Sequence, residues 1–416
     1  MRVLWITNIL FPEASVFLSG SPDLKSSGGW ILGAACSLID TRGITLAVAT
    51  VSDKVNKLVR VDGERITYFI LPLGRGNIAY NKEYEVFWKQ IKELYRPEII
   101  HIHGTEFSHG LAWVNANGAS NVVVSIQGLT SVIKDYYYSG LSISQIINMD
   151  ICGVLTLLKK SGRSKYSTQG KNEVLLIKSV NDIIGRTTWD RAHIWAINPK
   201  AKYHYCNETL RSEFYQGKWK YDLCRKHTIF VSQVGKTIKG LHQLIKALPL
   251  VLEEYPDTRV VVAGDSIYKT SLLSAFKNRY CHIARRMLRD YQLEGVFEFV
   301  GPQDEKGMKQ HMLSSNVFVL SSSIENSPNT LGEAQLLGVP CVSSYVGGAP
   351  DMIPNMDCGY LYRFSDFQML AFDICKIFKE SSSFDNSEMR LVAKQRHDAD
   401  NNLKSLLEIY NQIVNS

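Results

Sequence analysis

The sequence lacks the features that mark small disulfide-bonded, membrane-spanning and repetitive proteins. Its eight cysteines are scattered and form no C-x-x-C pair, which argues against a disulfide framework or a zinc site and predicts a reducing compartment. No apolar run reaches the roughly 20 residues that a bilayer-spanning helix needs. Neither a low-complexity tract nor a fixed-period repeat occurs, which argues against a solenoid or a propeller.

The composition that remains is that of an ordinary globular protein. Hydrophobic residues make up 45% and charged residues 21% of the 416 residues, a length that suits two domains of about 200 residues each. The formal net charge of +7 is mild for this length. It permits contact with phosphates or an anionic membrane surface without requiring nucleic acid, so we expect no nucleic-acid partner.

Short apolar runs alternate with amphipathic stretches in the first half of the chain. The run after Met1 and Arg2 is interrupted at Asn8 and precedes no small-residue cleavage pattern, so it is read as a buried strand rather than a signal peptide. Predicted strands are 2–7, 46–52, 99–103, 122–126, 182–185 and 202–206, with helices at 29–41 and 84–95. This alternation predicts a parallel sheet with helices on both faces.

The same pattern restarts in the second half. Predicted strands are 228–232, 259–263, 297–300, 317–320 and 339–343, with a helix at 241–255. The stretch 216–226 is polar and aromatic with little periodicity, and it is the predicted junction. The fold class is therefore α/β, with two Rossmann-like domains that face each other. Ligands of such sheets bind beyond the carboxyl ends of the strands.

The segment 321–340 carries the strongest functional signal. Ser327 suits the N-cap of a helix, Pro328 suits its first position, and Gly338 suits the residue beyond its end. The segment thus predicts a short helix after the strand 317–320. The free N–H groups and the positive dipole end of such a helix favour a bound diphosphate.

Two glutamates lie in or just before this helix, and their spacing resembles that of a known family. Glu325 precedes the helix and Glu333 lies within it, so the two carboxylates can hold sugar-like diols on either side of a diphosphate. The plainer alternative is a strand–loop–helix with two solvated glutamates. Seven residues separate the pair in E-N-S-P-N-T-L-G-E-A-x-x-x-G-V-P, which resembles the signature of the family-4 retaining glycosyltransferases with the GT-B fold.

The resemblance implies roles for this segment and a domain division. Glu325 would meet the hydroxyls of the donor sugar and Glu333 the ribose of the nucleotide. The backbone around Ser327, Pro328, Asn329 and Thr330 would meet the donor's diphosphate, and Asn326 would also bind the donor. In this fold a final helix returns to the first domain, which predicts an N-terminal domain of 1–220 with 400–416 and a nucleotide-sugar donor domain of 221–399.

A second stretch, 229–248, also resembles the family. The family has a strand that ends in G-R and is followed by K-G, and Lys239-Gly240 matches the second pair. Gln233 stands where the family has Arg. Lys239 can supply the cation that a departing nucleoside diphosphate needs, whereas Gln233 offers only hydrogen bonds. Lys239 and Glu325 are the predicted catalytic residues, although a single lysine is more often a surface residue.

Other donor-binding positions follow from strand ends. Gly28 and Gly29 open the helix after the first strand's loop, where glycine lets the backbone approach a phosphate. Gly264 and Gly301 resemble the strand-end turns of the family's nucleotide pocket. Gln127 directly follows the strand 122–126, at a position where many members of the family carry His. A glutamine side chain cannot act as an acid or a base.

The strand 99–103 leads into a loop that could form the rim of an acceptor site. His103, Glu106 and His109 are the predicted acceptor-side residues, with a structural role for each as an equal alternative. Their spacing does not match H-E-x-x-H, so no metal is predicted. No cofactor is predicted either, because the nucleotide sugar is a substrate.

Residues 141–178 combine an apolar stretch with several basic residues. A core helix followed by a solvated loop is the favoured interpretation, and a membrane-surface patch is the alternative.

Together these features predict a cytoplasmic glycosyltransferase, of hexosyl or N-acetylhexosaminyl type, that is metal-independent. Its donor would be a nucleotide-diphosphate-sugar and its acceptor a glycan or lipid-linked glycan, with peripheral contact at the inner face of the membrane through 141–178. The resemblance implies that the anomeric configuration is retained and that the reaction serves cell-surface polysaccharide biosynthesis. A nucleotide-sugar 2-epimerase and a non-catalytic sugar-nucleotide-binding subunit are the alternatives.

Overall fold

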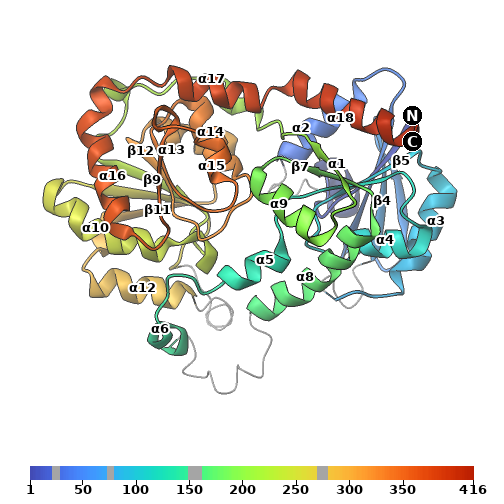
Figure 1. The fold of residues 1–416 in the computed structure, drawn as a ribbon, viewed down its shortest axis with the longest axis horizontal. Coiled ribbons are helices and arrows are strands. Elements are labelled where there is room, and N and C mark those ends of the chain that lie inside the picture. The colour runs from blue at the N-terminus through green and yellow to red at the C-terminus, as the bar shows by residue number, and fades with distance from the viewer. Residues whose placement is uncertain (21–28, 73–78, 149–161, 269–279) are drawn as a thin grey trace. The chain divides into compact units, whose positions relative to one another are not determined.

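The chain forms two compact units, each built on one parallel sheet. The computed structural model describes all residues except 21–28, 73–78, 149–161 and 269–279. Unit 1 comprises Met1–Lys134, Gly162–Thr209 and His397–Ser416, and unit 2 comprises Asp135–Ser161 and Leu210–Arg396. The two parallel-sheet units confirm the predicted α/β class (Figure 1).

The sheet of unit 1 has the strand order β3-β4-β2-β1-β5-β6-β7-β8 among the described residues. Its strands are β1 (Arg2–Ile6), β2 (Thr45–Ser52), β3 (Val59–Asp62), β4 (Ile66–Pro72), β5 (Ile99–His103), β6 (Val122–Ser125), β7 (Asp182–Gly185) and β8 (Lys202–Tyr205). All neighbours are parallel except β3, which is antiparallel to β4. The predicted strands are confirmed with small differences at their ends, whereas β3 and β4 were not expected.

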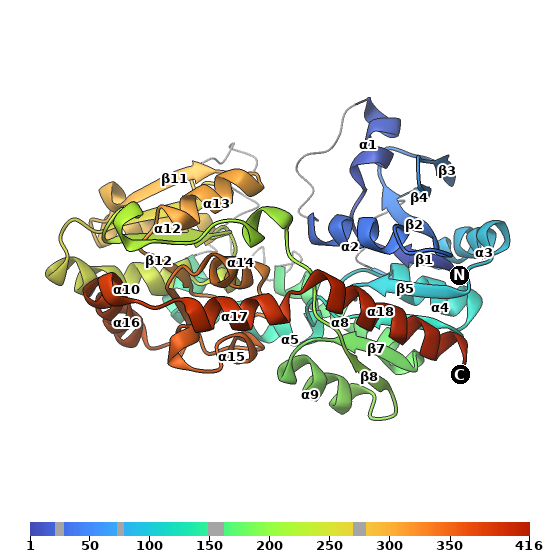
Figure 2. The same ribbon diagram turned by 90° about the horizontal axis from the view of Figure 1, so that it is seen from above.

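Helices cover both faces of this sheet (Figures 1 and 2). They are α1 (Pro12–Ser19), α2 (Gly29–Ile39), α3 (Tyr84–Tyr95), α4 (His109–Asn117), α5 (Thr130–Ile133), α8 (Gly162–Ser179), α9 (Thr188–Ile197) and α18 (Ala399–Val414). Side chains of α3, α4, α8 and α9 fill one face, and those of α2 and α18 fill the other. In α3, Tyr84, Trp88 and Ile91 are buried at helical spacing.

The last helix, α18, returns to the sheet of unit 1 and is held there by a buried hydrogen-bond chain. Trp5 Nε1 donates to the hydroxyl of Tyr410 at 3.0 Å, and this hydroxyl lies 2.6 Å from His101 Nδ1. His101 Nε2 lies 2.6 Å from Ser125 Oγ. Because an indole N–H only donates, the Tyr410 hydroxyl gives its proton to Nδ1, which leaves Nε2–H to donate to Ser125. The predicted return of the C-terminal helix is confirmed.

Unit 2 has the strand order β11-β10-β9-β12-β13-β14, and all of its neighbouring strands are parallel. Its strands are β9 (Thr228–Ser232), β10 (Arg259–Ala263), β11 (Phe297–Gly301), β12 (Val317–Leu320), β13 (Cys341–Ser344) and β14 (Tyr360–Tyr362). Only β14 was not expected. The stretch from Leu210 onward belongs to this unit, since Leu210, Phe214 and Trp219 are buried in its core.

Helices also cover both faces of the second sheet (Figure 1). They are α10 (Leu241–Glu254), α12 (Tyr280–Asp290), α13 (Glu305–Leu313), α14 (Asn329–Leu337), α15 (Ala349–Met352), α16 (Phe367–Glu380) and α17 (Ser387–Arg396). Side chains of α10, α12 and α16 fill one face, and those of α13, α14 and α17 fill the other.

The predicted apolar and basic stretch 141–178 is described only in part. Helix α6 (Ile143–Asn148) exposes Ile143, and α8 carries the basic residues Lys165 and Lys171. Residues 149–161 lie outside the described part of the chain, so the membrane-surface interpretation stays a prediction. No helix within the described residues is both long and apolar enough to cross a membrane.

We predict that Tyr410→Phe destabilises unit 1 by about 1–3 kcal/mol, because it leaves the buried Trp5 N–H and His101 Nδ1 without their partner. Urea unfolding followed by tryptophan fluorescence measures the change. Tyr345→Phe removes the same hydroxyl from an exposed side chain and serves as the control. Equal unfolding midpoints for the two variants would contradict the proposed role of the Tyr410 hydroxyl.

Candidate functional site

In unit 2, the order of the strands reverses between β9 and β12. The chain passes from β9 to β10 and β11 on one side and from β12 to β13 and β14 on the other. Ligands of open parallel sheets bind beyond the strand ends at such a reversal. The loop after β9 carries Lys239 in a short 3-10 helix (Thr237–Lys239), and the loop after β12 carries Glu325. Both predicted catalytic residues therefore lie at this edge.

Lys239 and Glu325 form an ion pair. Lys239 Nζ lies 2.6 Å from Glu325 Oε1, and Ser322 Oγ donates to the same oxygen at 2.6 Å. The side chains are only 21% and 13% exposed, so the pair is shielded from water and its attraction is stronger than that of a surface pair. The structure thus brings together the two residues predicted from separate motifs.

Two glycines allow the loops of this site to approach each other closely. Gly240 has φ +68°, and a Cβ there would lie 1.7 Å from the carbonyl oxygen of Ser321. Gly347 has φ +52°, and a Cβ there would lie 1.6 Å from the carbonyl oxygen of Glu325. The Gly348 N–H also donates to that oxygen at 3.1 Å. A side chain at Gly240 would push the Lys239 loop away from Ser321, and one at Gly347 would push the loop after β13 away from Glu325.

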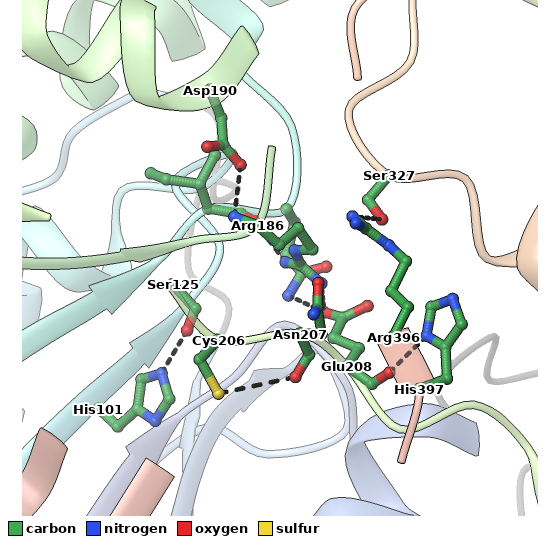
Figure 3. Close-up of polar contacts among 12 residues, drawn as sticks. His101, Ser125, Arg186, Asp190, Cys206, Asn207, Glu208, Ser327, Arg396 and His397 are labelled. Atoms are coloured by element: carbon green, nitrogen blue, oxygen red, sulfur yellow. Dashed lines mark hydrogen bonds and ion pairs between the residues drawn. The ribbon is translucent and has the colours of Figure 1, made fainter. Parts of the chain in front are cut away.

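The helix predicted after β12 is present as α14, with one correction at its start. Pro328, not Ser327, is the N-cap, and the helix begins at Asn329. Ser327 Oγ instead accepts a hydrogen bond from Arg396 Nη2 at 3.4 Å (Figure 3). Gly338 ends the helix with φ +77° as predicted. Asn326 is buried, whereas Asn329 and Thr330 are half-buried.

Glu333 is buried within α14 and is held by an arginine that the sequence analysis did not single out. Arg211 Nε and Nη2 donate to its two carboxylate oxygens at 2.6 Å and 2.7 Å. The Glu333 side chain is 2% exposed. Burial raises the pKa of Glu333, and the Arg211 guanidinium opposes that rise. Arg211 also lies 4.7 Å above the ring of Phe214. This bidentate geometry fixes the orientation of the carboxylate.

The predicted strand-end turns are neighbours at the same edge. Gln233 follows β9 with φ +56°, and its backbone N–H donates to the Ala263 carbonyl at 3.0 Å. The Gly264 N–H donates to the Gly301 carbonyl at 2.9 Å. The turns after β9, β10 and β11 are thereby linked, although the Gln233 side chain is exposed.

Unit 1 has a pocket of its own beyond the carboxyl ends of β5 to β8, closed on one side by α2 and α18. Its polar and aromatic lining residues are Trp5, Trp30, Ser37, His101, His103, Ser125, Gln127, Arg186, Cys206, Asn207, Glu208, Thr209 and Asn402. His103 and Gln127, which were predicted from strand ends, thus line one pocket.

The other predicted residues of unit 1 lie elsewhere. His109 is buried in α4, stacked on Phe107 with ring centroids 5.7 Å apart. The backbone carbonyl of Glu106 accepts a hydrogen bond from the Gln169 side chain. Neither residue lines the pocket. Gly29 is the first residue of α2, and Gly28 lies outside the described residues.

Arg186 and Glu208 form an ion pair in the pocket of unit 1 (Figure 3). Gln127 Nε2 donates to the same Glu208 carboxylate at 2.8 Å, and the backbone N–H of Arg186 donates to Asp190 at 3.0 Å. Sequence reasoning missed both charged residues. Arg186 directly follows the predicted strand 182–185 and Glu208 lies two residues after the predicted strand 202–206, but nothing in the sequence marks the two side chains as partners.

A match to a known protein family covers the region around Lys239, Glu325 and Glu333. Residues 212–398 match the family "Glycosyl transferases group 1". Spore coat protein SA of Bacillus subtilis is 27% identical over 260 residues, which cover 58% of this chain and 65% of that protein. A putative colanic acid biosynthesis glycosyltransferase of Salmonella typhimurium is 28% identical over 180 residues, which cover 38% of this chain and 44% of that protein. The matches thus span less than two thirds of these relatives.

Solved structures show the same fold over the whole chain. Sucrose-phosphate synthase from Thermosynechococcus elongatus aligns with a TM-score of 0.72 at 14% identity, covering 99% of each chain. The Anabaena protein HepE in complex with UDP-glucose aligns with a TM-score of 0.69 at 14% identity, covering 99% of this chain and all of that one. The chain therefore has the GT-B fold of two parallel-sheet α/β domains.

We predict that Arg211→Met destabilises unit 2 by about 3 kcal/mol at pH 8, because it leaves the buried Glu333 carboxylate without its cation. The loss should shrink toward pH 5. Without the guanidinium, burial raises the pKa of Glu333 further. The variant is then most stable at low pH, where Glu333 is protonated, and it loses stability as the pH rises through the raised pKa. Urea unfolding at both pH values measures this.

Two variants control the Arg211 experiment. The double variant Arg211→Met/Glu333→Gln should recover part of the stability and lose the pH dependence. Arg225→Met breaks an exposed pair with Glu298 and should cost less than about 1 kcal/mol. If Arg211→Met lost the same stability at pH 5 and pH 8, the electrostatic account would be wrong.

Proposed function

We propose that this chain, whose residues 212–398 match the family "Glycosyl transferases group 1", transfers a sugar from a nucleoside-diphosphate-sugar to a glycan or lipid-linked glycan acceptor. The reaction retains the anomeric configuration, needs no metal, and serves cell-surface polysaccharide biosynthesis at the cytoplasmic face of the membrane. The observation that carries this proposal is the Lys239–Glu325 pair beside the buried Glu333 at the strand reversal of unit 2.

Lys239 supplies positive charge where the nucleoside diphosphate departs. Its ammonium group is paired with Glu325, and a diphosphate, which carries more negative charge, competes for it. The first N–H groups of α14 add the positive end of a helix dipole close to the Glu325 loop. These groups stabilise the charge that develops as the bond to the sugar breaks.

Glu325 and Glu333 hold the two ends of the donor. Glu325 is fixed by Ser322 and Lys239 through one oxygen, and a carboxylate has further lone pairs for sugar hydroxyls. Glu333 has both oxygens bound to Arg211, so ribose hydroxyls must share or displace that arginine. The complex of HepE with UDP-glucose, a protein of the same fold, supports a nucleotide sugar as the ligand.

The proposal is tested by incubating the full chain with UDP-hexoses and UDP-N-acetylhexosamines, with and without glycan acceptors. We expect nucleoside diphosphate release that depends on acceptor and continues in excess EDTA. Conversion of the donor sugar without acceptor would establish a 2-epimerase, and donor binding without turnover would establish a non-catalytic subunit. Complete, metal-reversible loss in EDTA would overturn the metal-independent mechanism.

We predict that Glu333→Gln weakens binding of both the intact donor and the free nucleoside diphosphate by about tenfold, because a hydrogen bond to a charged group is lost. Glu325→Gln should spare nucleoside diphosphate binding and reduce donor turnover by about tenfold or more. Calorimetric affinity and initial rates separate the two effects. Glu388→Gln changes an exposed glutamate of α17 and is the control.

The two glutamate variants also decide whether these carboxylates contribute to nucleoside diphosphate binding and donor turnover. If both bound nucleoside diphosphate and turned over donor like wild type, the paired-carboxylate mechanism would be wrong, and the segment 321–340 would be only a well-capped helix.

A further inference from the structure

We propose that Arg396 is a diphosphate-binding residue of the donor site, with its guanidinium group at the N-terminal end of α14. The inference rests on the proposed function, which assigns this edge of unit 2 to a nucleoside-diphosphate-sugar. Arg396 is the last residue of α17 and belongs to unit 2, so its contact with the segment before α14 lies within one unit. It lies outside both segments that the sequence analysis assigned to the donor.

Helix α17 lies along α14 and runs in the opposite direction. Ala393 of α17 is buried in the same core as the apolar side chains of α14. Arg390 Nε donates to the carbonyl of Leu336, near the C-terminal end of α14, at 3.0 Å. At the other end, Arg396 Nη2 donates to Ser327 Oγ, just before α14, at 3.4 Å (Figure 3). The packing of the two helices therefore holds Arg396 at the start of α14.

The two arginines meet opposite ends of the α14 dipole. Arg390 meets the C-terminal end, where the carbonyl groups carry partial negative charge and a cation is favourable. Arg396 meets the N-terminal end, where unpaired N–H groups carry partial positive charge and a cation is unfavourable. The first turn of α14 contains no acidic residue. An anion bound at this end interacts favourably with both the helix and the arginine, so the arrangement favours an anionic ligand.

The hydrogen bond to Ser327 is weaker than the one a phosphate would make. Its 3.4 Å length exceeds the usual range of about 2.7–3.2 Å. The acceptor is a neutral hydroxyl group, whose own O–H is directed to Met352 Sδ at 3.7 Å. A phosphate oxygen forms shorter and stronger charge-assisted bonds, and the planar fork of a guanidinium can bind two such oxygens at once. A diphosphate is therefore a better partner for Arg396 than the Ser327 hydroxyl.

Arg396 and Lys239 contact the same short segment. Lys239 is paired with Glu325, and Arg396 contacts Ser327, two positions further along the chain. Both cations thus lie at the segment that leads into α14. Because the charge of Lys239 is already opposed by a carboxylate, Arg396 supplies positive charge in addition to that pair. A diphosphate carries negative charge on both phosphoryl groups, and two cations can each oppose one of them.

The test compares a nucleoside diphosphate with its nucleoside, because only the former carries the phosphates that Arg396 would bind. Calorimetry on the full chain in EDTA ranks UDP, GDP and ADP. The tightest of these is then used together with its nucleoside, whose affinity is measured by competition. We expect Arg396→Met to weaken the nucleoside diphosphate about tenfold and the nucleoside less than about twofold. Arg396→Lys should lose less affinity, because it keeps the charge without the planar fork.

Two variants of the same helix are the controls. Lys394→Met removes an exposed positive charge from α17 and should bind both ligands like wild type. Arg390→Met removes an arginine that donates to the backbone carbonyls of Leu336 and Gly217. It should lower the unfolding midpoint without changing the ratio of the two affinities. The ratio therefore separates a lost phosphate contact from a lost net charge and from damaged packing.

Two results would overturn the role of Arg396. An unchanged nucleoside diphosphate affinity in Arg396→Met would remove this arginine from the site. A fall by the same factor for the nucleoside diphosphate and the nucleoside would show that Arg396 supports the structure, as Arg390 does.

The wild-type measurement keeps this outcome apart from the proposed function. Wild type that binds a nucleoside diphosphate no more tightly than Arg396→Met refutes the role of Arg396 and leaves the donor site in place. Wild type that binds none of UDP, GDP and ADP refutes the donor site itself, and the inference with it.

Discussion

Buried charges must be paired, and this constraint organises both candidate sites. Glu333, with 2% of its side chain exposed, is bound at both oxygens by Arg211. In unit 1, Arg186 and Glu208 form an ion pair. An uncompensated charge in either place would cost several kcal/mol, so each pair fixes the loop that carries it. The positions of the strand-end loops follow from these pairs as much as from the strands.

The same constraint acts differently in the two units. In unit 2 the Lys239–Glu325 pair is partly exposed, with 21% and 13% of the two side chains accessible. In unit 1 the Arg186–Glu208 pair is more deeply buried, with 4% and 11% accessible. Because burial weakens the screening of charge, the attraction within the unit 1 pair is the less attenuated of the two.

The fold and the strand-end residues could be predicted from the sequence, whereas the pairing partners could not. Strand ends can be recognised in the sequence because apolar runs stop there, and this identified Gln127 and His103. Lys239 and Glu325 followed from the two segments that resemble a known family. Arg211 and Glu208 lie between elements, where no periodicity marks a side chain as buried. Pro328 replaced Ser327 as the N-cap because the cap depends on backbone angles that the local sequence does not determine.

Glu208 and Arg211, which were not predicted, lie on either side of the point where the chain passes from unit 1 to unit 2. After β8, Glu208 is anchored in unit 1 by Arg186, and three residues later Arg211 is anchored in unit 2 by Glu333. At the return, Arg396 donates to Ser327 in unit 2, and His397 Nδ1 donates to the backbone carbonyl of Glu208 in unit 1 at 2.8 Å. Each connection thus has polar contacts on both sides of the point where the chain crosses from one unit to the other.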